Sequence, residues 1–406
     1  MIKKFIDLKT FQKIPRVATM KKVLILGGAG AIGSEATRDI VRTSKFSEIV
    51  VGDIDVERAK SFIAQLGDDR LSVMKVDASN VEKLVDAVKG FDLVVSALPF
   101  RYDINVTKAC VEAGVCGIDV ATEESQFDLN DEAKKAGILY VPGCGATPGT
   151  TNLMAKYGIQ YLDEAESVEI YFAAFRCTAI APGLLYTTFY EFDPKVDERT
   201  YYENGRYIRV GPFEGEKEVE FHELIGRQKC YYVPHEEVMT LPMVFPQLKK
   251  VEVRGCFPPK TMELMRMLLK YGLYQDEPVQ VGDAKILPRD FFFNFLLRSK
   301  EAREQDVWAY GLVVVVKGRK RGVETVVTLK NRHPPMEKWG GSRAYAKNVG
   351  IPLSIGAQMI AEGKVDKLGV LPPEGVFDPE EFFKELAKRG IDIDVKIEQY
   401  GVGRTK

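Results

Sequence analysis

The sequence predicts an α/β protein of two domains, in which a doubly wound parallel sheet is followed by an α+β domain. Three observations predict this organisation. Short, uniformly apolar strands alternate with amphipathic helices over residues 21–141, as in a parallel sheet that is covered on both faces. A glycine-rich loop separates the first strand from the first helix. After Gly143 the chain is rich in Tyr, Phe and Thr with a period of two, which is typical of a mixed or antiparallel sheet.

The elements of the first domain follow one another with short breaks. The predicted strands are Lys22–Leu26, Ile49–Asp53, Leu71–Val76, Phe91–Ala97, Gly117–Val120 and Ile138–Val141. The predicted helices run from the glycine loop to about Arg42, and over Val56–Leu66, Asn80–Val88, Ile104–Ala113 and Leu129–Ala136.

The second domain is predicted from period-two stretches at Ser167–Ala174, Glu218–Glu223 and Lys249–Val253. A hairpin is expected from strands Trp308–Lys317 and Val323–Lys330, joined by the basic turn Gly318–Gly322. Helices are predicted over 352–363 and 379–389. In the second of these, Asp378 is the expected N-cap and Gly390 the residue that follows the C-cap.

Charge and composition exclude several classes of protein. The 406 residues include 57 Lys plus Arg and 58 Asp plus Glu, so the net charge of −1 provides no general attraction for nucleic acid. No apolar run reaches the length of a membrane span, and residues 1–20 lack the apolar region of a secretory signal. The six cysteines form no C-x-x-C pair, which disfavours a structural zinc site, and six in 406 residues are too few for a disulfide scaffold. We therefore expect a cytoplasmic protein with no metal site and no nucleic-acid or membrane partner.

The glycine loop carries the strongest functional signal. It follows a strand and opens a helix, which is the context of a Rossmann-type dinucleotide site, where the helix N-terminus faces the pyrophosphate. The first glycine allows the tight turn, the second lets the backbone approach the pyrophosphate, and the third lets helix and strand pack closely. A flavin dinucleotide also fits this loop, although no second flavin signature is present. The residues of this G-x-G-x-x-G motif are Gly28, Ala29, Gly30, Ala31, Ile32 and Gly33.

Asp53 ends the second predicted strand and is expected, with the adjacent Ile54, to contact the adenosine half of the cofactor. A carboxylate at this position accepts hydrogen bonds from the ribose hydroxyls. Asp53 and the nearby Asp55 and Glu57 would repel a 2′-phosphate, so NAD is predicted in preference to NADP. Arg58 is the residue that could reverse this preference.

Loops at the carboxyl ends of the other strands are expected to line the same crevice, since ligands bind there in open α/β sheets. The loop after the third strand should meet the adenine, and the next two should meet the nicotinamide half. Helix N-capping is an alternative role for Asp77 and Ser79. The candidate residues in these loops are Asp77, Ala78, Ser96, Ala97, Leu98, Pro99, Val120 and Ala121.

An ordered set of segments resembles the saccharopine dehydrogenase-like family, which includes saccharopine reductases and lysine 6-dehydrogenases. The segments are VLILGGAGAIG (23–33), VDASN (76–80), DLVVSALPF (92–100), IDVATE (118–123), DEAKKAGILYVPGCGATPGTTNLMA (131–155) and GVLPPEGVFDPEEFFKELAKRGI (369–391).

The resemblance implies a dinucleotide-binding domain over residues 1–145, to which residues from about 345 to 406 return. It implies a domain for substrate and dimer contacts over 146–344, and therefore a homodimer. It further implies hydride transfer at a carbon that bears an amine, in a small amino-acid substrate. Two departures from saccharopine reductases stand out, since Thr147 replaces an aspartate and Ala173–Arg176 replaces a Gly-Gly-Leu-Pro stretch.

Candidate substrate residues are the cations that could hold a carboxylate, together with Thr147 in the loop near the nicotinamide. Arg176 interrupts an apolar strand, Arg254 ends a strand, and Arg101 follows the Ser96–Pro99 loop. For acid–base chemistry, His235 and Tyr232 belong to a cluster of tyrosines and carboxylates in which a histidine could titrate near neutrality.

These observations predict an NAD(P)-dependent oxidoreductase that acts on the CH–NH group of a lysine-derived amino acid, with saccharopine dehydrogenase-like chemistry first. The alternatives are a lysine 6-dehydrogenase, a carboxynorspermidine-type reductive condensation, and a non-catalytic NAD-binding regulatory protein.

Overall fold

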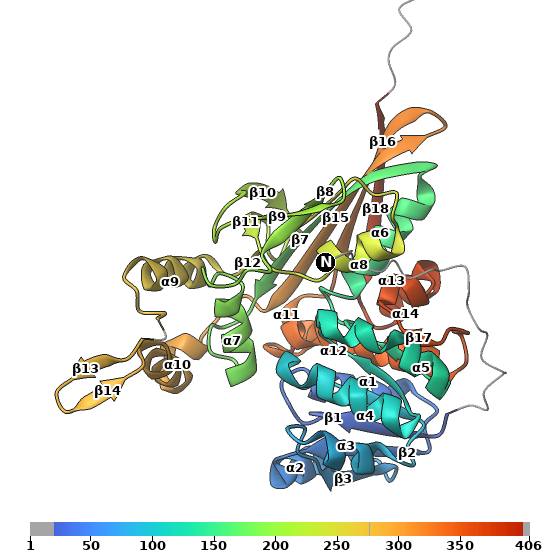
Figure 1. Ribbon diagram of the computed structural model, residues 1–406, viewed down its shortest axis with the longest axis vertical. Coiled ribbons are helices and arrows are strands. Elements are labelled where there is room, and N and C mark those ends of the chain that lie inside the picture. Colours follow the sequence, from blue (N-terminus) through green and yellow to red (C-terminus); the bar gives the residue numbers. More distant parts are fainter. Residues whose placement is uncertain (1–19, 276, 401–406) are drawn as a thin grey trace, which may run out of the picture.

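The computed structural model describes residues 20–275 and 277–400, which form two units that are each built on a large sheet (Figure 1). The basic segment ahead of Met20 lies outside these residues. The described helices include none that is long and apolar enough to cross a membrane.

The first unit is a seven-stranded parallel sheet with the order β17-β6-β5-β4-β1-β2-β3, which confirms the doubly wound prediction. Its strands are β1 (Lys22–Leu26), β2 (Glu48–Asp53), β3 (Leu71–Lys75), β4 (Leu93–Ser96), β5 (Cys116–Asp119), β6 (Leu139–Val141) and β17 (Gly369–Val370). Its helices are α1 (Gly33–Thr43), α2 (Val56–Leu66), α3 (Val81–Val88), α4 (Asp103–Ala113) and α5 (Asn130–Ala136), with the short turns η1 (Phe100–Tyr102) and η2 (Glu124–Leu129).

The second unit is a nine-stranded mixed sheet with the order β10-β11-β12-β7-β15-β16-β18, to which β8 and β9 are attached through β12. Its strands are β7 (Glu164–Phe175), β8 (Thr200–Glu203), β9 (Arg206–Arg209), β10 (Lys217–Glu220), β11 (Arg227–Tyr232), β12 (Lys250–Cys256), β15 (Ala309–Lys320), β16 (Val323–Arg332) and β18 (Asp392–Tyr400). The helices between them are α6 (Thr150–Tyr161), α7 (Pro182–Tyr190), α8 (Glu237–Val244), α9 (Pro259–Lys270) and α10 (Pro288–Arg298), with the hairpin β13 (Val279–Val281) and β14 (Ala284–Ile286) and the turn η3 (Glu301–Arg303).

Two predicted boundaries in the second half of the chain were wrong. The hairpin turn is only Arg321–Gly322, because both strands extend further and the two turn residues take positive φ values of 52° and 75°. The helix expected to begin at Pro352 begins nine residues earlier as α12 (Arg343–Ala361), with Pro352 in its interior. Close packing on α1 stabilises this helix, since a Cβ on Gly350 would lie 2.7 Å from the backbone nitrogen of Ala36.

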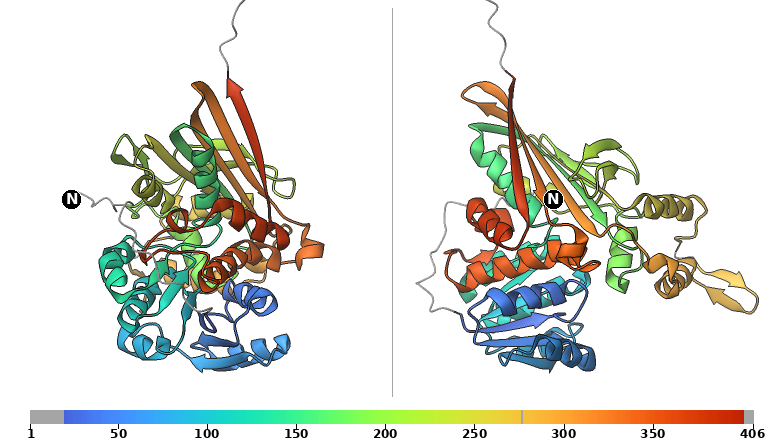
Figure 2. Two further views of the ribbon diagram at one scale, coloured as in Figure 1. Left: turned by 90° about the vertical axis from the view of Figure 1, so that its right-hand side faces the viewer. Right: turned by 180° about the vertical axis from the view of Figure 1, so that it is seen from behind.

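The chain then returns to the first unit through α11 (Met336–Trp339), α12, α13 (Pro373–Val376) and α14 (Pro379–Lys388), whereas β18 pairs with β16 in the large sheet (Figure 2). Asp378 is the N-cap of α14 and accepts a hydrogen bond from the Glu381 nitrogen at 2.9 Å, as predicted. These crossings hold the two sheets together, with the carboxyl edge of the parallel sheet facing α6, α7 and α8.

An arm formed by α9, the β13–β14 hairpin and α10 projects from the second unit (Figures 1 and 2). Large apolar side chains are exposed along it, including Phe291 and Phe295 at 60% and 59%. An isolated two-stranded hairpin is marginally stable in water, and the arm leaves several large apolar side chains exposed.

Candidate active site

The glycine loop between β1 and α1 packs so closely on its neighbours that side chains are excluded at Gly28 and Gly33. A Cβ on Gly33 would lie 2.1 Å from the Gly27 oxygen, and a Cβ on Gly28 would lie 2.9 Å from the Thr37 hydroxyl. Gly27 has a positive φ of 68°, and Thr37 donates to the Gly28 oxygen at 3.0 Å. The amino end of α1 is thereby presented to the carboxyl edge of the sheet, where a pyrophosphate fits.

Asp53 ends β2 and lies beside this loop. Its side chain is buried and accepts from the backbone nitrogen of Asp55 at 3.0 Å. Nη2 of Arg58 donates to both Asp53 carboxylate oxygens, at 2.9 and 3.0 Å. Ile54 is 64% exposed, so an apolar surface stands next to this charged pair. The pair carries both the carboxylate that suits a ribose and a cation that suits a phosphate.

The remaining crevice loops sit at the expected edge. Asp77 accepts from the Ser79 nitrogen in a local turn, and Ala78 is tied to α4 by Asn105, whose amide donates to its carbonyl at 3.0 Å. The capping role considered for Asp77 and Ser79 was wrong, because Asn80 is the N-cap of α3 and accepts from the Lys83 nitrogen. The other predicted loop residues lie at the carboxyl ends of β4 and β5, which are successive neighbours on one side of β1. They are Ser96, the last residue of β4, and Ala97, Leu98, Pro99, Val120 and Ala121.

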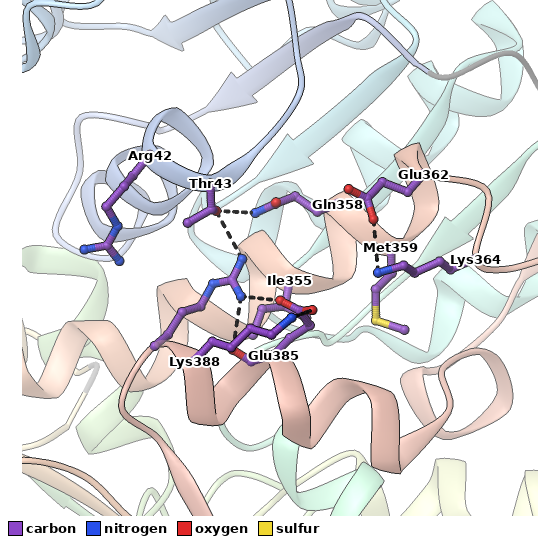
Figure 3. Close-up of a pocket in the computed structure, with 10 residues that line it drawn as sticks. Arg42, Thr43, Ile355, Gln358, Met359, Glu362, Lys364, Glu385 and Lys388 are labelled. Carbon is purple, nitrogen blue, oxygen red and sulfur yellow. Dashed lines mark hydrogen bonds and ion pairs between the residues drawn. The ribbon is translucent and has the colours of Figure 1, made fainter.

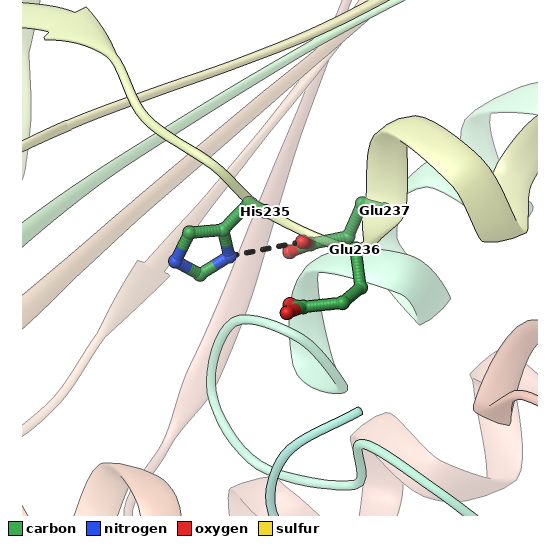
Figure 4. Close-up of side chains that lie close together, drawn as sticks. All are labelled: His235, Glu236 and Glu237. Carbon is green, nitrogen blue, oxygen red and sulfur yellow. Dashed lines mark hydrogen bonds and ion pairs between the residues drawn. The ribbon is translucent and has the colours of Figure 1, made fainter. Parts of the chain in front are cut away.

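A buried network of polar side chains lies between this edge and the large sheet. Its centre is Glu237, the first residue of α8, which is fully buried. Thr147 and Thr151 donate to Oε1 of Glu237 at 2.5 and 2.8 Å, and Nδ1 of His235 lies 3.1 Å from Oε2 (Figure 4). Thr147 therefore positions the glutamate that orients His235, which fixes the imidazole with Nε2 as its remaining nitrogen.

Electrostatics make His235 a cation at neutral pH. Burial alone would lower the pKa of His235, but the carboxylates Glu237, Glu236 and Glu191 outweigh burial and raise it to about 9. Burial raises the pKa of Glu236 and of Glu191 to about 7, against the opposing effect of His235. Burial would also raise the pKa of Glu237, but the hydrogen bond and charge of His235 lower it. The network is thus one ion pair with two further carboxyl groups poised near neutrality.

Arg176 continues the network at the end of β7. It is 3% exposed, and its Nη2 donates to the Thr188 hydroxyl at 2.6 Å and to the Leu184 carbonyl at 3.0 Å. The guanidinium lies between the rings of Phe257 and Tyr345, at 5.3 and 5.4 Å. Its buried Nε has no hydrogen-bond partner among the described residues. Arg176 is therefore a buried cation held by neutral groups, with a donor still free.

Aromatic rings form the wall of the large sheet behind the network. Phe172 lies 5.0 Å from the His235 ring, and Tyr310 stacks on Tyr345 at 5.2 Å. Gly255 faces Phe172 across the strand pair, where a Cβ would lie 2.2 Å from the ring. This wall surrounds the His235 ring with planar, apolar groups.

The structure does not bring Tyr232 and Arg254 to this network. Arg254 pairs in register with both Tyr171 and Tyr232, and Tyr171 points to the sheet face opposite that of Phe172, its neighbour in β7. Tyr232 donates to Glu252 at 2.6 Å, Arg254 binds Glu252 at 3.0 Å, and the Arg254 guanidinium lies 4.0 Å from the Tyr232 ring. These candidates form a separate cluster in which each charge has a partner.

Arg101 lies at the rim of the crevice in η1. It is exposed, and its guanidinium lies 4.8 Å from the Tyr102 ring.

Three residues that the sequence analysis did not identify lie close to the network: Asp103, Glu191 and Thr151. Asp103 is fully buried, and neither of its carboxylate oxygens has a partner among the described residues. An acidic residue that ends an apolar helix, as Glu191 does after Tyr190, is the sequence signal that would have identified one of them.

Ligand atoms of His235, Glu236 and Glu237 lie within 4.8 Å of one another, a spacing that a divalent metal can use. Both Glu237 oxygens already accept hydrogen bonds from Thr147, Thr151 and His235. Glu237 and His235 are therefore explained as members of a hydrogen-bonded network.

A cavity of about 450 Å³ lies elsewhere, between the carboxyl end of α1 and the helices α12 and α14 (Figure 3). It opens at the end of α1 remote from the glycine loop. Its charges pair with one another, since Lys364 binds Glu362 at 3.0 Å and Lys388 binds Glu385 at 2.7 Å. This cavity has no free charge that would select a ligand, and the network between the two sheets remains the candidate active site.

Known proteins resemble both units. Residues 23–141 match the family described as "Saccharopine dehydrogenase NADP binding domain", and residues 145–391 match "Saccharopine dehydrogenase C-terminal domain". A carboxyaminopropylagmatine dehydrogenase of Synechocystis sp. is 26% identical over 92% of this chain and 96% of its own length. A carboxynorspermidine synthase of Vibrio alginolyticus is 24% identical over 80% of this chain and 83% of its own.

The same fold is found in a solved structure, an apo saccharopine dehydrogenase (L-Glu forming) from Saccharomyces cerevisiae. It covers 94% of this chain and 100% of its own with a TM-score of 0.68, at 18% identity. The two family matches together span most of the chain and confirm the resemblance carried by the sequence segments. The chain therefore belongs to the saccharopine dehydrogenase family and is a dehydrogenase-type oxidoreductase with a nicotinamide cofactor.

Proposed function

We propose that the protein forms a secondary amine by reductive condensation of a primary amine with an amino-acid semialdehyde, the carboxynorspermidine-type alternative of the sequence analysis. The observation that carries this proposal is the buried site, which combines one free cation donor, Arg176, with several carboxylates around His235. The carboxylate of an amino acid needs a cation such as Arg176, and an amine needs carboxylates.

The relatives support this alternative over the saccharopine dehydrogenase-like chemistry that the sequence analysis put first. The two relatives named for polyamine products match 92% and 80% of this chain. A saccharopine dehydrogenase (L-glutamate-forming) of Schizosaccharomyces pombe matches only 36% of it. Saccharopine-type cleavage and lysine ε-deamination therefore become the second and third candidates.

The cofactor would be held by the glycine loop, Asp53 and the loops after β4 and β5, with the pyrophosphate at the amino end of α1, which packs closely on the loop at Gly33. When bound, a nicotinamide supplies the hydride that reduces the carbon–nitrogen double bond. Arg176 binds the carboxylate of the semialdehyde through its free Nε. The rings of Phe172 and Tyr310 exclude bulk water.

His235 is the proposed acid–base group. Protonated at neutral pH, it donates a proton from Nε2 as the tetrahedral adduct of amine and aldehyde loses water. Glu237 holds Nδ1 and stabilises the imidazolium, and Thr147 and Thr151 hold Glu237. In the reverse direction His235 removes the proton from the attacking water.

We propose NAD as the preferred cofactor, with the Asp53 carboxylate accepting from the adenosine ribose. The Asp53–Arg58 pair supports this, because the carboxylate is buried and fixed while the arginine is more exposed. Asp53→Asn should weaken NADH binding about tenfold and leave NADPH binding unchanged, whereas Arg58→Ala should raise the preference for NADH. Fluorescence titration with both cofactors measures the two ratios, and a wild-type preference for NADPH would overturn the proposal.

NAD(P)H oxidation at 340 nm tests the reaction itself. The protein is given a four-carbon amino-acid semialdehyde with 1,3-diaminopropane or agmatine, and separately saccharopine or lysine with NAD(P). Turnover in the first set alone supports the proposal. Turnover with saccharopine or lysine alone would replace it. Silence throughout, with a melting temperature that NAD still raises, would favour a cofactor-binding protein without this chemistry.

We also propose a homodimer, in which the arm covers apolar surface of a second copy. Phe291 and Phe295, exposed on one side of α10, support it. Light scattering should give twice the chain mass for the wild type, and a lower mass for Phe291→Ser/Phe295→Ser.

A cytoplasmic location is a further proposal, supported by the six cysteines, all of which are free thiols.

A further inference from the structure

Glu191, at the end of α7, is a buried carboxylate that the structure leaves without a partner. The residue is 5% exposed, and its Oε2 has no hydrogen-bond partner among the described residues. None of the ion pairs in residues 20–275 and 277–400 involves its side chain. The groups that act on it electrostatically are His235, Arg176, Glu236 and Arg199. A buried, unpartnered carboxylate is costly, and it persists where a ligand completes it.

Glu236 supplies a second carboxylate beside it. Figure 4 shows the Glu236 carboxylate on the side of the His235 ring but outside the His235–Glu237 hydrogen bond. No other side chain of the described residues forms an ion pair with it. Glu236 is also close enough to influence Asp103 at the start of α4 and Tyr190 at the end of α7. It therefore lies where the second unit meets the carboxyl edge of the parallel sheet.

The charges of the site do not balance. Glu237 neutralises His235 through a direct contact of 3.1 Å. Arg176 is held by the neutral acceptors Thr188 and Leu184, and the proposed reaction uses its charge for the substrate carboxylate. Glu191 and Glu236 are then left without a cation of their own.

Aromatic rings adjoin these carboxylates. Phe100, which follows the Ser96–Pro99 loop, lies 6.0 Å from the Tyr186 ring and 5.7 Å from the Tyr190 ring. A Cβ on Gly183 at the start of α7 would lie 3.6 Å from Pro99, so α7 touches the cofactor loop. Faces of aromatic rings suit both methylene groups and cations. A chain of methylenes that ends in a cation would lie on these rings with its charged end at the two glutamates.

We propose that Glu191 and Glu236 form a cation subsite, which binds the distal positively charged nitrogen of the amine substrate and selects a diamine or an aminoalkyl guanidine over a simple alkylamine. This inference rests on the proposed function and adds the substrate class and the residues that select it. The reacting amine at the other end of the chain reaches the carbon held between Arg176 and His235.

The test compares an amine with and without its distal charge. We measure kcat and KM for 1,3-diaminopropane and for propylamine with the semialdehyde and NAD(P)H. The wild type should prefer the diamine at least thirtyfold in kcat/KM. Glu191→Gln and Glu236→Gln should each lower that preference about tenfold, because the KM of the diamine rises much more than the KM of propylamine. Glu236→Asp, which keeps the charge, should retain most of the preference, and the exposed Glu263→Gln is the matched control.

A preference that stays within threefold of wild type in both glutamine variants would overturn the subsite. So would an equal loss with both amines at an unchanged melting temperature, because a general defect does not select for the distal charge. If the wild type turns over no amine, the proposed reaction fails while the subsite is still tested. Calorimetry with the NAD-loaded protein should then show diamine binding that exceeds propylamine binding and is lost in Glu236→Gln, and equal binding of the two amines would exclude it.

Discussion

The two faces of the large sheet carry buried charged clusters of opposite character. On the outer face, Glu252 binds Lys250 at 2.7 Å and Arg254 at 3.0 Å, and Tyr232 donates to it at 2.6 Å. On the inner face, toward the parallel sheet, Glu191 and Glu236 have no ion-pair partner among the described residues. Both faces are built from the same strands, so the two clusters differ in whether their carboxylates have cationic partners within the protein.

The pKa values express this difference. Burial would raise the pKa of Glu169 on the outer face, but Lys217, Lys317 and Tyr171 donate to it and lower the pKa to about 2. Burial raises the pKa of Glu191 on the inner face to about 7, because the charges of His235, Arg176 and Arg199 offset burial only in part. The paired charges of the outer face are neutralised by other residues of the sheet. The unpaired carboxylates of the inner face indicate a site where a charged group of a ligand binds.

The largest expected effect separates the two faces by activity. His235→Gln should lower kcat by about 10²–10⁴-fold, because the proton donor of the inner network is lost. Tyr232→Phe, on the outer face, should change kcat less than threefold. Initial rates of amine-dependent NAD(P)H oxidation, at matched melting temperatures, check both. Equal losses would mean that the outer cluster takes part in the reaction.

The next effect is on stability. Glu252→Gln should cost about 3 kcal/mol, because Arg254 and Lys250 lose the carboxylate that neutralises them. The exposed pair of Lys249 and Glu166 offers a control, and Glu166→Gln should cost less than about 1 kcal/mol. Denaturant unfolding measures the two. Similar costs would show that the outer cluster is no more than a surface network.

Glu191→Gln should have the opposite sign. The folded protein holds the Glu191 proton more tightly than the unfolded chain, so stability falls as pH rises from about 4.5 to about 7 and stays lowered above that. Removing the charge should therefore stabilise the empty protein at pH 8 by about 2 kcal/mol, with little gain at pH 4. Unfolding at the two pH values tests this, and a destabilised variant at pH 8 would reveal a partner for Glu191.

The smallest effect is on ligand affinity. A dication of two quaternary ammonium groups, whose charge does not titrate, should bind about tenfold more tightly at pH 8 than at pH 6, since Glu191 and Glu236 ionise near pH 7. His235 stays largely protonated over this interval because its pKa is raised to about 9, and Glu237 remains ionised because its pKa is lowered. Calorimetry at both pH values measures the change. A flat profile in the wild type would mean that these carboxyl groups do not face the ligand.

The sequence by itself determined the features that depend on neighbours along the chain. Strand Lys22–Leu26 and helix Val56–Leu66 were predicted with the bounds that the structure has, because apolar periodicity and turn residues are local signals. The glycine spacing belongs to the turn between β1 and α1, Asp53 ends the next strand, β2, and the N-cap Asp378 is set by one helix end. The family resemblance extended this to the order of the two units.

The tertiary structure decided which polar residues meet. Tyr232 and His235 are three residues apart, yet Tyr232 contacts Glu252 and His235 contacts Glu237. Strand alternation assigns Tyr232 to one face of the sheet, but β11 ends at Tyr232, so it assigns no face to His235. Thr147, Arg176 and Glu191 reach the same site from three elements distant in sequence. The interior position of Pro352 was settled by close packing of α12 on α1. The sequence pattern predicts where helices and strands form, but the packing of the two sheets decides which side chain becomes the partner of a buried charge.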